Sequence, residues 1–416
     1  MTGRLILEAG DPAHGGFCVA RVPDDDASGL GGKVALVTGA LPGERVEVEI
    51  AEDHPRHLIA RTVEVIEASP SRVPHVWPLA ERTGVGGADL GHVAPDAQLR
   101  WKEAVIADTL RRIGGHAVVE AAAAVTPDGR VRVQRVEGGT VRWRTRVGFV
   151  VDDEGRPAMR RGRSHETVAL DSMPLAVEEM NGLELFGGSW QLRPGTEVAA
   201  VAPSASPPLV VTTGGVWRAP GRKVGAEVME RVPTEYGPLR YRLHAGGFWQ
   251  SHRAAPEVLV KAVLEAARPK PGDHVLELYS GAGLFTLPLA HAVGARGAVL
   301  GLEGARRAVA DATKNLSGLP QARVEVARVD GRRISAERAR IDVVVLDPPR
   351  TGAGGAVTAA LKARRPERIV YVACDPAALA RDLETLVAEY DILRLDAYDL
   401  FPSTHHVEMV AALVRR

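Results

Sequence analysis

Cys374 and Glu408 are the two side chains of this sequence whose types and settings best fit covalent catalysis. Cys374 lies in the run YVACDP, between an apolar stretch and a helical pattern. A thiol at a helix N-terminus has a lowered pKa and is enriched in the nucleophilic thiolate. Glu408 follows 34 residues later in the loop FPSTHHVE, where a carboxylate could act as a general base. A buried structural cysteine and a His-rich surface loop are the alternative interpretations.

His405 and His406 lie in the same loop and raise the question of a metal site. The two histidines are adjacent, and no second cluster of ligands is visible in the sequence. Protein sites for zinc and related ions draw their ligands from several separated positions. We therefore predict that no metal ion is bound.

A second candidate region is the segment SGAG, which follows the apolar run VLELY. Gly281 and Gly283 allow a ligand to approach the backbone closely at a helix N-terminus. A dinucleotide fingerprint would have a third glycine at the position of Thr286. The spacing Glu-x-x-x-Gly-x-Gly, which begins at Glu277, instead resembles that of class I methyltransferases.

Three carboxylates lie where predicted strands of this region end. Glu303 ends the run VLGLE, 20 residues after Gly283, and could accept hydrogen bonds from both hydroxyls of a ribose; a surface acid is the alternative. Asp330 ends RVEVARVD, where such enzymes contact adenine. Asp347 begins DPPR, in which two prolines stiffen the loop and make the carboxylate a rigid anchor for cofactor or substrate.

The elements that must position these residues alternate between strand and helix over residues 241–416. Apolar runs such as VLELY, AVLGLE, VVVL and RIVYVA are each followed by a helical pattern. Fully apolar strands that alternate with helices predict a parallel, doubly wound sheet, and such sheets bind ligands beyond the carboxyl ends of their strands. We therefore expect an α/β, Rossmann-like domain with the candidate residues gathered at one sheet edge.

The preceding part of the chain predicts two further domains. Residues 1–70 contain five short runs with strand alternation, separated by Gly and Pro, which indicates a small β-barrel of OB type. Residues 71–240 are expected to form a central mixed α+β domain. Within it, residues 90–115 have helical spacing that ends at Gly-Gly, and residues 120–240 are rich in strand patterns.

Composition limits the class of protein. The 416 residues are 45% hydrophobic and 25% charged with a net charge of zero, which is typical of a globular chain whose core needs no disulfides. The sequence lacks a basic and apolar leader and a run of about 18 apolar residues, so we expect no signal peptide and no membrane span. Its two cysteines, Cys18 and Cys374, fit a reducing cytoplasm.

The charges are unevenly distributed along the chain. Residues 1–70 hold 6 basic and 12 acidic side chains, whereas residues 130–163 hold 10 arginines against 4 acidic groups. An arginine-rich segment can neutralise phosphates, although a solvated strand surface is an equal alternative. The acidic N-terminal barrel is not expected to bind phosphates strongly by itself.

Several motifs together resemble one known family. GGFWQSHR, VLELYSGAGLFTLPLA, VVVLDPPRTG, IVYVACDPAALARDL and LFPSTHHVEMV look like the RNA 5-methyluridine methyltransferases, in the order in which that family has them. GALPGERVEVEI and IEASPSRVPH resemble the TRAM domain, a small RNA-binding barrel of RNA-modifying enzymes. The resemblance covers nearly the whole chain and is strongest over residues 240–416.

The resemblance implies S-adenosyl-L-methionine as the methyl donor, Cys374 as the nucleophile and Glu408 as the general base. It implies donor contacts for four residues, and the predicted donor site includes three more: Gln250, Tyr279, Glu303 and Asp347, with Gly281, Gly283 and Asp330. The catalytic pair suits the chemistry. Addition of a thiolate to carbon 6 of uracil makes carbon 5 nucleophilic, and a base must then remove the carbon 5 proton.

The segment around Gln250 departs from the family pattern. The family usually continues with Val-Asn after this glutamine, whereas Ser251 and His252 follow here. Phe248 and Trp249 precede it and could line the site or pack in the core.

A second departure concerns iron. Many TRAM-bearing relatives hold an iron–sulfur cluster on four cysteines, three of them around a Cys-Gly-Gly-Cys run. The matching segment here is Val85-Gly86-Gly87-Ala88, and the chain has two cysteines. A cluster on four thiolates cannot form within this chain. We therefore expect no iron–sulfur cluster and a segment that is held by packing alone.

The expected partner is structured RNA that presents an extruded uridine, because the reactive carbons cannot be reached inside a helix. The barrel and the arginine-rich middle favour ribosomal over transfer RNA, and we expect a monomer that contacts no membrane. An RNA-binding protein without turnover and an amino-group methyltransferase that uses Asp347 alone are the alternatives. Arg350 argues against the latter, in which an aromatic residue follows Asp-Pro-Pro, and Thr286 argues against a nicotinamide oxidoreductase.

Overall fold

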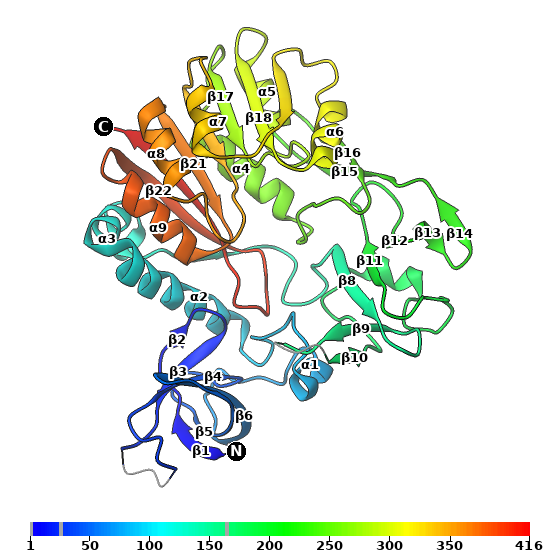
Figure 1. Ribbon diagram of the computed structural model, residues 1–416, viewed down its shortest axis with the longest axis vertical. Helices are drawn as coiled ribbons and strands as arrows, with labels where there is room; N and C mark the ends of the chain where they lie inside the picture. The colour runs from blue at the N-terminus through cyan, green and yellow to red at the C-terminus, as the bar shows by residue number, and fades with distance from the viewer. Residues whose placement is uncertain (1–2, 25–27, 163–165) are drawn as a thin grey trace.

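A sheet of eight strands forms the centre of the C-terminal part of the chain (Figure 1). The structure is a computed structural model that describes residues 3–24, 28–162 and 166–416. Five neighbouring strands, β19 to β21 in sheet order, are parallel, and β23 pairs antiparallel with both β21 and β22. The strands lie in the order β19 (Ala322–Val326), β18 (Ala298–Glu303), β17 (His274–Leu278), β20 (Val343–Leu346), β21 (Arg368–Ala373), β23 (Glu408–Arg415), β22 (Tyr390–Asp399) and β7 (Val133–Arg135).

Both faces of this sheet are buried, because successive apolar side chains of a strand point to opposite sides. Val275 of β17 belongs to one hydrophobic core and Leu276 to the other. Helices supply both cores and confirm the expected doubly wound, Rossmann-like fold. The first core contains α4 (Ala255–Ala267), α5 (Thr286–Val293) and α6 (Arg306–Asn315), and the second contains α7 (Gly331–Ala336), α8 (Gly355–Arg364) and α9 (Pro376–Leu386).

A helical segment from the first third of the chain completes the second core. Helix α2 (Pro95–Thr109) begins a helical stretch that is interrupted at the predicted Gly-Gly pair, where Gly115 has a φ angle of +71°. One π-helical turn, η1 (Leu110–Gly114), and α3 (Gly115–Ala123) continue it and pack against α9. Strand β7 pairs with β22 at the edge of the C-terminal sheet. Residues 95–135 therefore pack with the C-terminal part of the chain, although they lie within the range 71–240 that the sequence assigned to the central domain.

The N-terminal strands form one six-stranded, mostly antiparallel sheet, in the order β1 (Arg4–Glu8), β5 (Arg45–Asp53), β6 (His57–Glu67), β4 (Val34–Thr38), β3 (Phe17–Arg21) and β2 (Pro12–Ala13). β1 also contacts β3, so the sheet curls on itself. Trp101 and Val105 of α2 enter its core. Figure 1 shows α2 between this sheet and α9.

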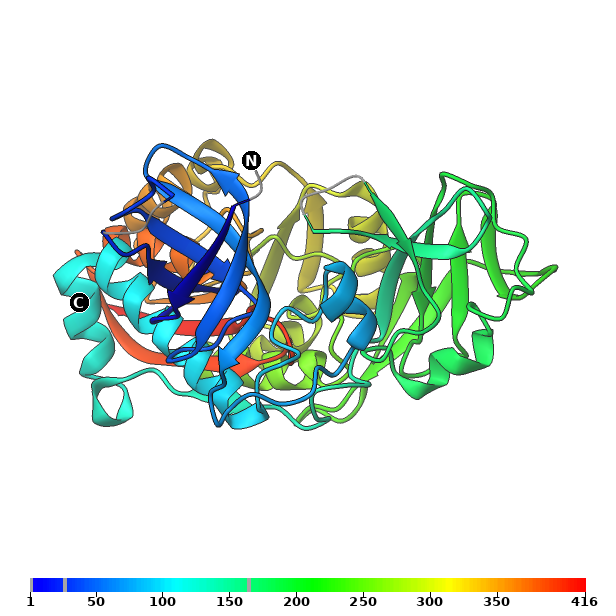
Figure 2. The same cartoon turned by 90° about the horizontal axis from the view of Figure 1, so that it is seen from below.

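The central part is a seven-stranded antiparallel sheet that lies apart from the N-terminal sheet (Figure 2). Its order is β10 (Thr167–Ala169), β9 (Pro157–Arg160), β8 (Arg146–Val151), β11 (Glu197–Val201), β12 (Leu209–Thr212), β13 (Gly215–Ala219) and β14 (Arg222–Val224). A two-stranded ribbon, β15 (Glu227–Val232) and β16 (Leu239–His244), follows it. Tyr241 of β16 is buried and donates a hydrogen bond to the Leu284 carbonyl, so the ribbon joins the first core of the C-terminal sheet.

The segment from Val85 to Ala88 packs into the core of the central part. Both residues are buried in the same cluster as Trp77, which precedes the short helix α1 (Pro78–Thr83). The short helices η2 (Pro127–Gly129) and η3 (Glu178–Leu183) complete the elements. Among the helices of the described residues, none has the length and apolar character needed to cross a membrane.

Candidate active site

Cys374 and Glu408 are brought side by side by the pairing of β21 with β23. The last pair of this antiparallel ladder joins Ala373 to Met409. Cys374 is the next residue along one strand and Glu408 the next along the other, so the two residues face each other across the ladder. The Cys374 side chain is half-buried and that of Glu408 is buried.

Asp347 lies at the same sheet edge. It follows Leu346, which pairs with Leu278 of β17 and Tyr371 of β21, and its backbone N–H donates to the Leu278 carbonyl at 3.4 Å. The negative charges of Asp347 and Glu408 both act on the Cys374 thiol. The carboxyl ends of β17, β20 and β21 therefore gather the sequence-predicted residues, as expected for this fold.

The loop after β17 forms the predicted donor site. Tyr279, Gly281 and Gly283 all have positive φ angles of +62°, +53° and +87°, so the chain turns sharply beyond the strand. Glu303, at the end of β18, accepts hydrogen bonds from the N–H groups of Gly281 at 3.0 Å and Ala305 at 2.7 Å. These bonds hold the Glu303 carboxylate beside the glycine turn that follows β17.

This loop has room for a ligand against its backbone. A methyl group placed on Gly281 would meet no atom within 4 Å. A carboxylate held beside an open glycine turn fits a nucleoside such as the adenosyl group of S-adenosyl-L-methionine, whose ribose hydroxyls are hydrogen-bond donors.

Thr286 has a structural role that explains why a third glycine is absent. Its hydroxyl donates a 2.5 Å hydrogen bond to the carboxyl group of Glu277, which is buried in β17. Burial raises the pKa of Glu277 to about 8, despite this bond. Thr286 thus satisfies a buried carboxyl group directly beneath the turn.

Asp330 and Asp375 cap helices. Asp330 accepts a 2.9 Å hydrogen bond from the Arg333 N–H at the start of α7, and Asp375 accepts a 2.8 Å bond from the Ala378 N–H at the start of α9. For Asp330 this capping role stands beside the predicted adenine contact, which stays a prediction. For Asp375 it places a carboxylate between the helix N-terminus and Cys374.

The two aromatic residues of the GGFWQ segment lie in different environments. Phe248 is 79% exposed, whereas Trp249 is buried with its ring centre 5.1 Å from that of Tyr241. His252 is also buried and stacks on Trp143 at 5.5 Å. Gln250 is half-buried, and its carbonyl accepts a 3.4 Å bond from the Thr145 hydroxyl. Trp249 and His252 therefore pack in the interior, while Phe248 remains free to meet a ligand.

The electrostatics of the catalytic pair differ from the sequence-based expectation. Burial, Glu408 and Asp347 raise the pKa of the Cys374 thiol to about 12, and Arg350 opposes the shift. The expected lowering by the helix N-terminus is wrong, because burial of the thiol, with the charges of Glu408 and Asp347, dominates and shifts the pKa in the opposite direction. Burial and Asp347 raise the pKa of Glu408 well above its usual value, and burial raises that of Asp347 to about 7.

Sequence reasoning missed a basic cluster beside the thiol. Arg350 donates a 3.2 Å hydrogen bond to Nε2 of His406, and burial together with neighbouring charges lowers the pKa of His406 to about 3, so the ring is neutral. Arg144 is close enough to Arg350 that burial and this second cation lower its pKa. The DPPR motif could have indicated Arg350, but Arg144 lies 206 positions earlier in the chain.

The loop that carries Glu408 is anchored by residues of the α2 region. Lys102 is fully buried and its ammonium contacts the Asp399 carboxylate at 2.5 Å and the Phe401 carbonyl at 3.1 Å. The Ser403 N–H donates a 2.8 Å hydrogen bond to the side-chain oxygen of Gln98. These contacts position the loop before it enters β23.

A second anchor reaches the N-terminal sheet. Asp89 accepts hydrogen bonds from Nδ1 of His405 at 2.6 Å and from the His405 N–H at 2.9 Å. His14, in the turn between β2 and β3, lies 3.4 Å from the Asp375 carboxylate. The turn of the N-terminal barrel therefore contacts Asp375, the residue after Cys374, and the His14 ring lies 6.2 Å from the ring of His405 in the loop before Glu408.

Comparison with known proteins agrees with this architecture. The family model described as tRNA (Uracil-5-)-methyltransferase matches residues 217–416, and that of the TRAM domain matches residues 5–63. A relative in Streptomyces avermitilis, described as an uncharacterized RNA methyltransferase, is 38% identical over 98% of this chain and 97% of its own. The 23S rRNA (uracil(1939)-C(5))-methyltransferase RlmD of Acidithiobacillus ferrooxidans is 32% identical over 92% of this chain and 93% of its own.

A solved structure shares the fold over the whole chain. The tRNA (uracil-54, C5)-methyltransferase of Pyrococcus abyssi, in complex with S-adenosyl-L-homocysteine, covers 98% of this chain and 100% of its own, with a TM-score of 0.70 and 22% identity. The fold and the relatives define an RNA methyltransferase with a Rossmann-like domain and a TRAM domain. More narrowly, the chain belongs to the family of S-adenosylmethionine-dependent RNA (uracil-5-)-methyltransferases.

Proposed function

We propose that this chain methylates carbon 5 of a uridine in ribosomal RNA through a covalent bond between Cys374 and carbon 6 of the base. The observation that carries the proposal is the position of Cys374 opposite Glu408, one step beyond the Ala373–Met409 pair. A nucleophile and a base on opposing strands can act on adjacent carbons of one flat ring.

The donor is held by the loops beyond β17, β18 and β20. Glu303 binds the ribose hydroxyls, and Tyr279, Asp347 and Gln250 complete the contacts, with Gly281, Gly283 and Asp330 beside them. When bound, S-adenosyl-L-methionine supplies an electrophilic methyl group. Phe248, the most exposed of these neighbours, stacks on an extruded base, since aromatic side chains bind unstacked nucleobases in this way.

Cys374 starts the reaction on the base. The half-buried Cys374 thiol releases its proton to water. The thiolate then gives an electron pair to carbon 6, and the electrons of the carbon 5–carbon 6 double bond move toward the O4 oxygen as an enolate. Carbon 5 is then nucleophilic and forms a bond to the methyl carbon, while the electrons of the broken methyl–sulfonium bond stay on the sulfur of the departing S-adenosyl-L-homocysteine. Arg350 assists, because it is the positive charge that opposes the high pKa of the thiol.

Glu408 ends the reaction. Its carboxylate removes the proton from carbon 5, the electron pair of that bond restores the carbon 5–carbon 6 double bond, and the sulfur leaves with the electrons of the carbon–sulfur bond. Asp347 shares the buried site, and two carboxyl groups so close together do not ionise independently. Burial disfavours the charged form of both groups, so the folded protein holds protons on this pair to a higher pH than free carboxyl groups would.

Ribosomal RNA is the proposed substrate class. The Acidithiobacillus ferrooxidans relative, named for 23S rRNA, is similar over nearly the whole of both chains, which supports this choice over transfer RNA. The arginine-rich segment of residues 130–163 gives further support, because arginines neutralise RNA phosphates.

Mass mapping of 5-methyluridine in RNA from a strain that lacks the gene tests this function. We expect a ribosomal RNA site to lose its methyl group and to regain it with the wild-type gene or with Cys18→Ala, but not with Cys374→Ala. A loss confined to transfer RNA would overturn the ribosomal assignment. Unchanged 5-methyluridine in every RNA would overturn the proposed function.

A further inference from the structure

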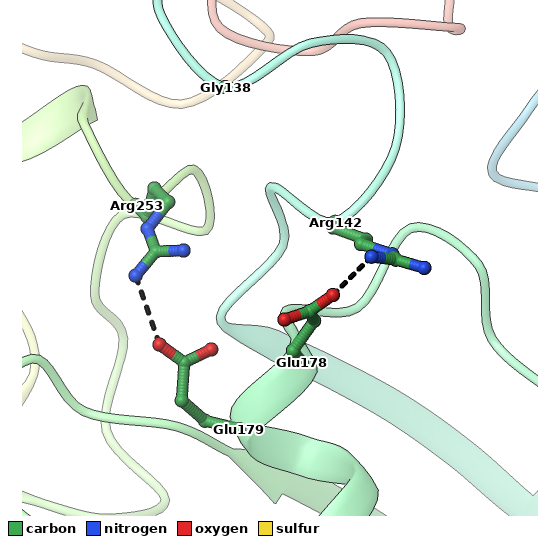
Figure 3. Close-up of a pocket in the computed structure, with 5 residues that line it drawn as sticks. All are labelled: Gly138, Arg142, Glu178, Glu179 and Arg253. Carbon is green, nitrogen blue, oxygen red and sulfur yellow. Dashed lines mark hydrogen bonds and ion pairs between the residues drawn. The ribbon is translucent and has the colours of Figure 1, made fainter.

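A hollow of about 600 Å³ lies between the central part and the GGFWQSHR segment, and it is lined by Gly138, Arg142, Glu178, Glu179 and Arg253. Figure 3 shows Arg142 and Arg253 entering from opposite walls, each joined to one glutamate of η3. A volume of this size matches the range of sites that bind nucleotide-sized ligands. Neither the catalytic pair nor the predicted donor site uses these residues.

Backbone hydrogen bonds connect the segments that form the walls of the hollow. The Arg142 N–H donates to the Pro174 carbonyl at 3.0 Å, and the Arg253 N–H donates to the Trp143 carbonyl at 3.0 Å. The Val177 N–H, just before η3, donates to the Arg144 carbonyl at 3.0 Å. Both arginines therefore project from a fixed frame, although their side chains are long and mobile.

The same frame leads to the active site. Arg144 forms a β-bridge with His252, one residue before Arg253. A methyl group placed on Gly138 would lie 3.8 Å from the His252 ring, so the pocket wall rests on this histidine. The Ser403 hydroxyl donates a 3.0 Å bond to the Thr140 carbonyl, which connects the loop of Gly138 to the loop of Glu408.

Each of the two arginines can leave its glutamate for another anion at little cost in free energy. Arg142 and Glu178 are each 64% exposed, and Arg253 and Glu179 are 50% and 51% exposed. Exposed pairs of this kind contribute about 0–1 kcal/mol. A guanidinium group can bind a phosphate, like a carboxylate, through two parallel hydrogen bonds, so a phosphate can take the place of either glutamate. The glutamates therefore hold the arginines in place without blocking an exchange of partners.

We propose that this hollow binds a nucleotide of the RNA strand that flanks the target uridine, with Arg142 and Arg253 exchanging Glu178 and Glu179 for phosphate oxygens. The proposal rests on the proposed function, because it takes RNA to be the substrate. Gly138, with a φ angle of +127° and no side chain, lets the strand pass close to the backbone.

Filter binding of a full-length 23S rRNA transcript, over a series of salt concentrations, tests the pocket with three double variants. The first is Arg142→Gln with Arg253→Gln, and the second is Glu178→Gln with Glu179→Gln. The control is Arg416→Gln with Asp391→Asn. These two residues form an exposed ion pair where β22 begins and β23 ends, on the C-terminal sheet. Circular dichroism melting checks that each variant folds.

The two pocket variants are expected to act in opposite directions. The arginine variant should raise Kd about tenfold and reduce the slope of log Kd against log salt by about 1 to 2. The glutamate variant, which frees both arginines, should lower Kd roughly threefold. The control should stay within about twofold of the wild type. The proposal is overturned if the arginine variant binds like the control, or if the glutamate variant weakens binding as well.

Methyl transfer is measured in the same reactions. A wild-type chain that binds the transcript but transfers no methyl group contradicts the proposed function alone, since the Kd values still decide whether the pocket binds RNA. Both proposals are supported if the arginine variant raises Kd, the glutamate variant lowers Kd, and the wild-type chain transfers methyl groups to the transcript.

Discussion

The ammonium group of Lys102 lies 2.5 Å from the Asp399 carboxylate, and both side chains are buried although 297 positions separate them in the chain. Asp399 is the last residue of β22, and the loop that carries Glu408 begins after it. Lys102 therefore holds the entrance of the catalytic loop to helix α2. We assign the pair a positioning role, because Lys102 also contacts the Phe401 carbonyl within the same loop.

Substitution Lys102→Ala is expected to lower the free energy of unfolding by about 3–5 kcal/mol, because it leaves the Asp399 charge buried without a partner. The change is measured from urea denaturation. Arg111→Ala is the matched control, since Arg111 pairs with Asp108 on the exposed surface of the same helical segment and should cost under about 1 kcal/mol. Equal losses for the two variants would contradict the anchoring role. Lys102→Met combined with Asp399→Leu should recover much of the stability.

Asp347→Asn is expected to stabilise the folded protein at alkaline pH. Burial raises the folded-state pKa of Asp347 from 3.8 to about 7, so the folded chain keeps a proton that the unfolded chain loses. The stability associated with this group is complete below pH 3.8 and is lost as the pH rises through 7. An asparagine carries no such cost. The variant should therefore melt a few degrees above the wild type at pH 8 but close to it at pH 4.5, and a difference that is independent of pH would refute the assignment.

The thiol of Cys374 is expected to react slowly in the protein without ligands. Because its pKa is about 12, the rate of alkylation by iodoacetamide should still rise with pH at pH 10. Cys18 is fully buried and should not be alkylated. Alkylation of a Cys374→Ala chain measures any reaction of Cys18. Arg350→Gln should slow alkylation further at each pH. A plateau below pH 8 would show instead that the resting protein already holds a thiolate.

Glu408→Gln is expected to trap the reaction after methyl transfer. A glutamine cannot take the carbon 5 proton, so the sulfur cannot leave, and turnover should fall by about 10² to 10⁴. Denaturing gels with natural ribosomal RNA should show a complex of protein and methylated RNA that the wild type does not accumulate. Normal turnover by this variant would exclude Glu408 as the base.

The parts of the site that the sequence predicted are those in which chemistry and chain position coincide. Gly281, Glu303, Asp347 and Cys374 each follow an apolar strand, and a parallel sheet must bring such positions to one edge. The alternation of strands and helices was sufficient for this inference, and the observed sheet confirms it. The catalytic and binding roles of these residues remain predictions.

The parts that escaped prediction depend on contacts between distant segments. Nothing in the local sequence indicates that Lys102 meets Asp399, that Asp89 meets His405, or that Arg144 approaches Arg350. The helix was predicted to end at Gly114 and Gly115, and the helical geometry is interrupted there, because Gly115 has a φ angle of +71°. The sequence did not indicate that a further helix, α3, begins at this break and packs against α9. The thiol pKa was misjudged because the burial of Cys374 and its closeness to Glu408 and Asp347 became visible only in the folded chain.

The covalent bond to Cys374 is tested most directly with RNA that contains 5-fluorouridine at the methylated position. Fluorine on carbon 5 cannot be removed as a proton, so the bond between sulfur and carbon 6 should persist after methyl transfer. In the presence of S-adenosyl-L-methionine, we expect a complex that survives denaturation, with the nucleotide on the peptide that contains Cys374, and no complex with Cys374→Ala. Methyl transfer to natural RNA by Cys374→Ala, or a cross-link that survives this substitution, would contradict this expectation.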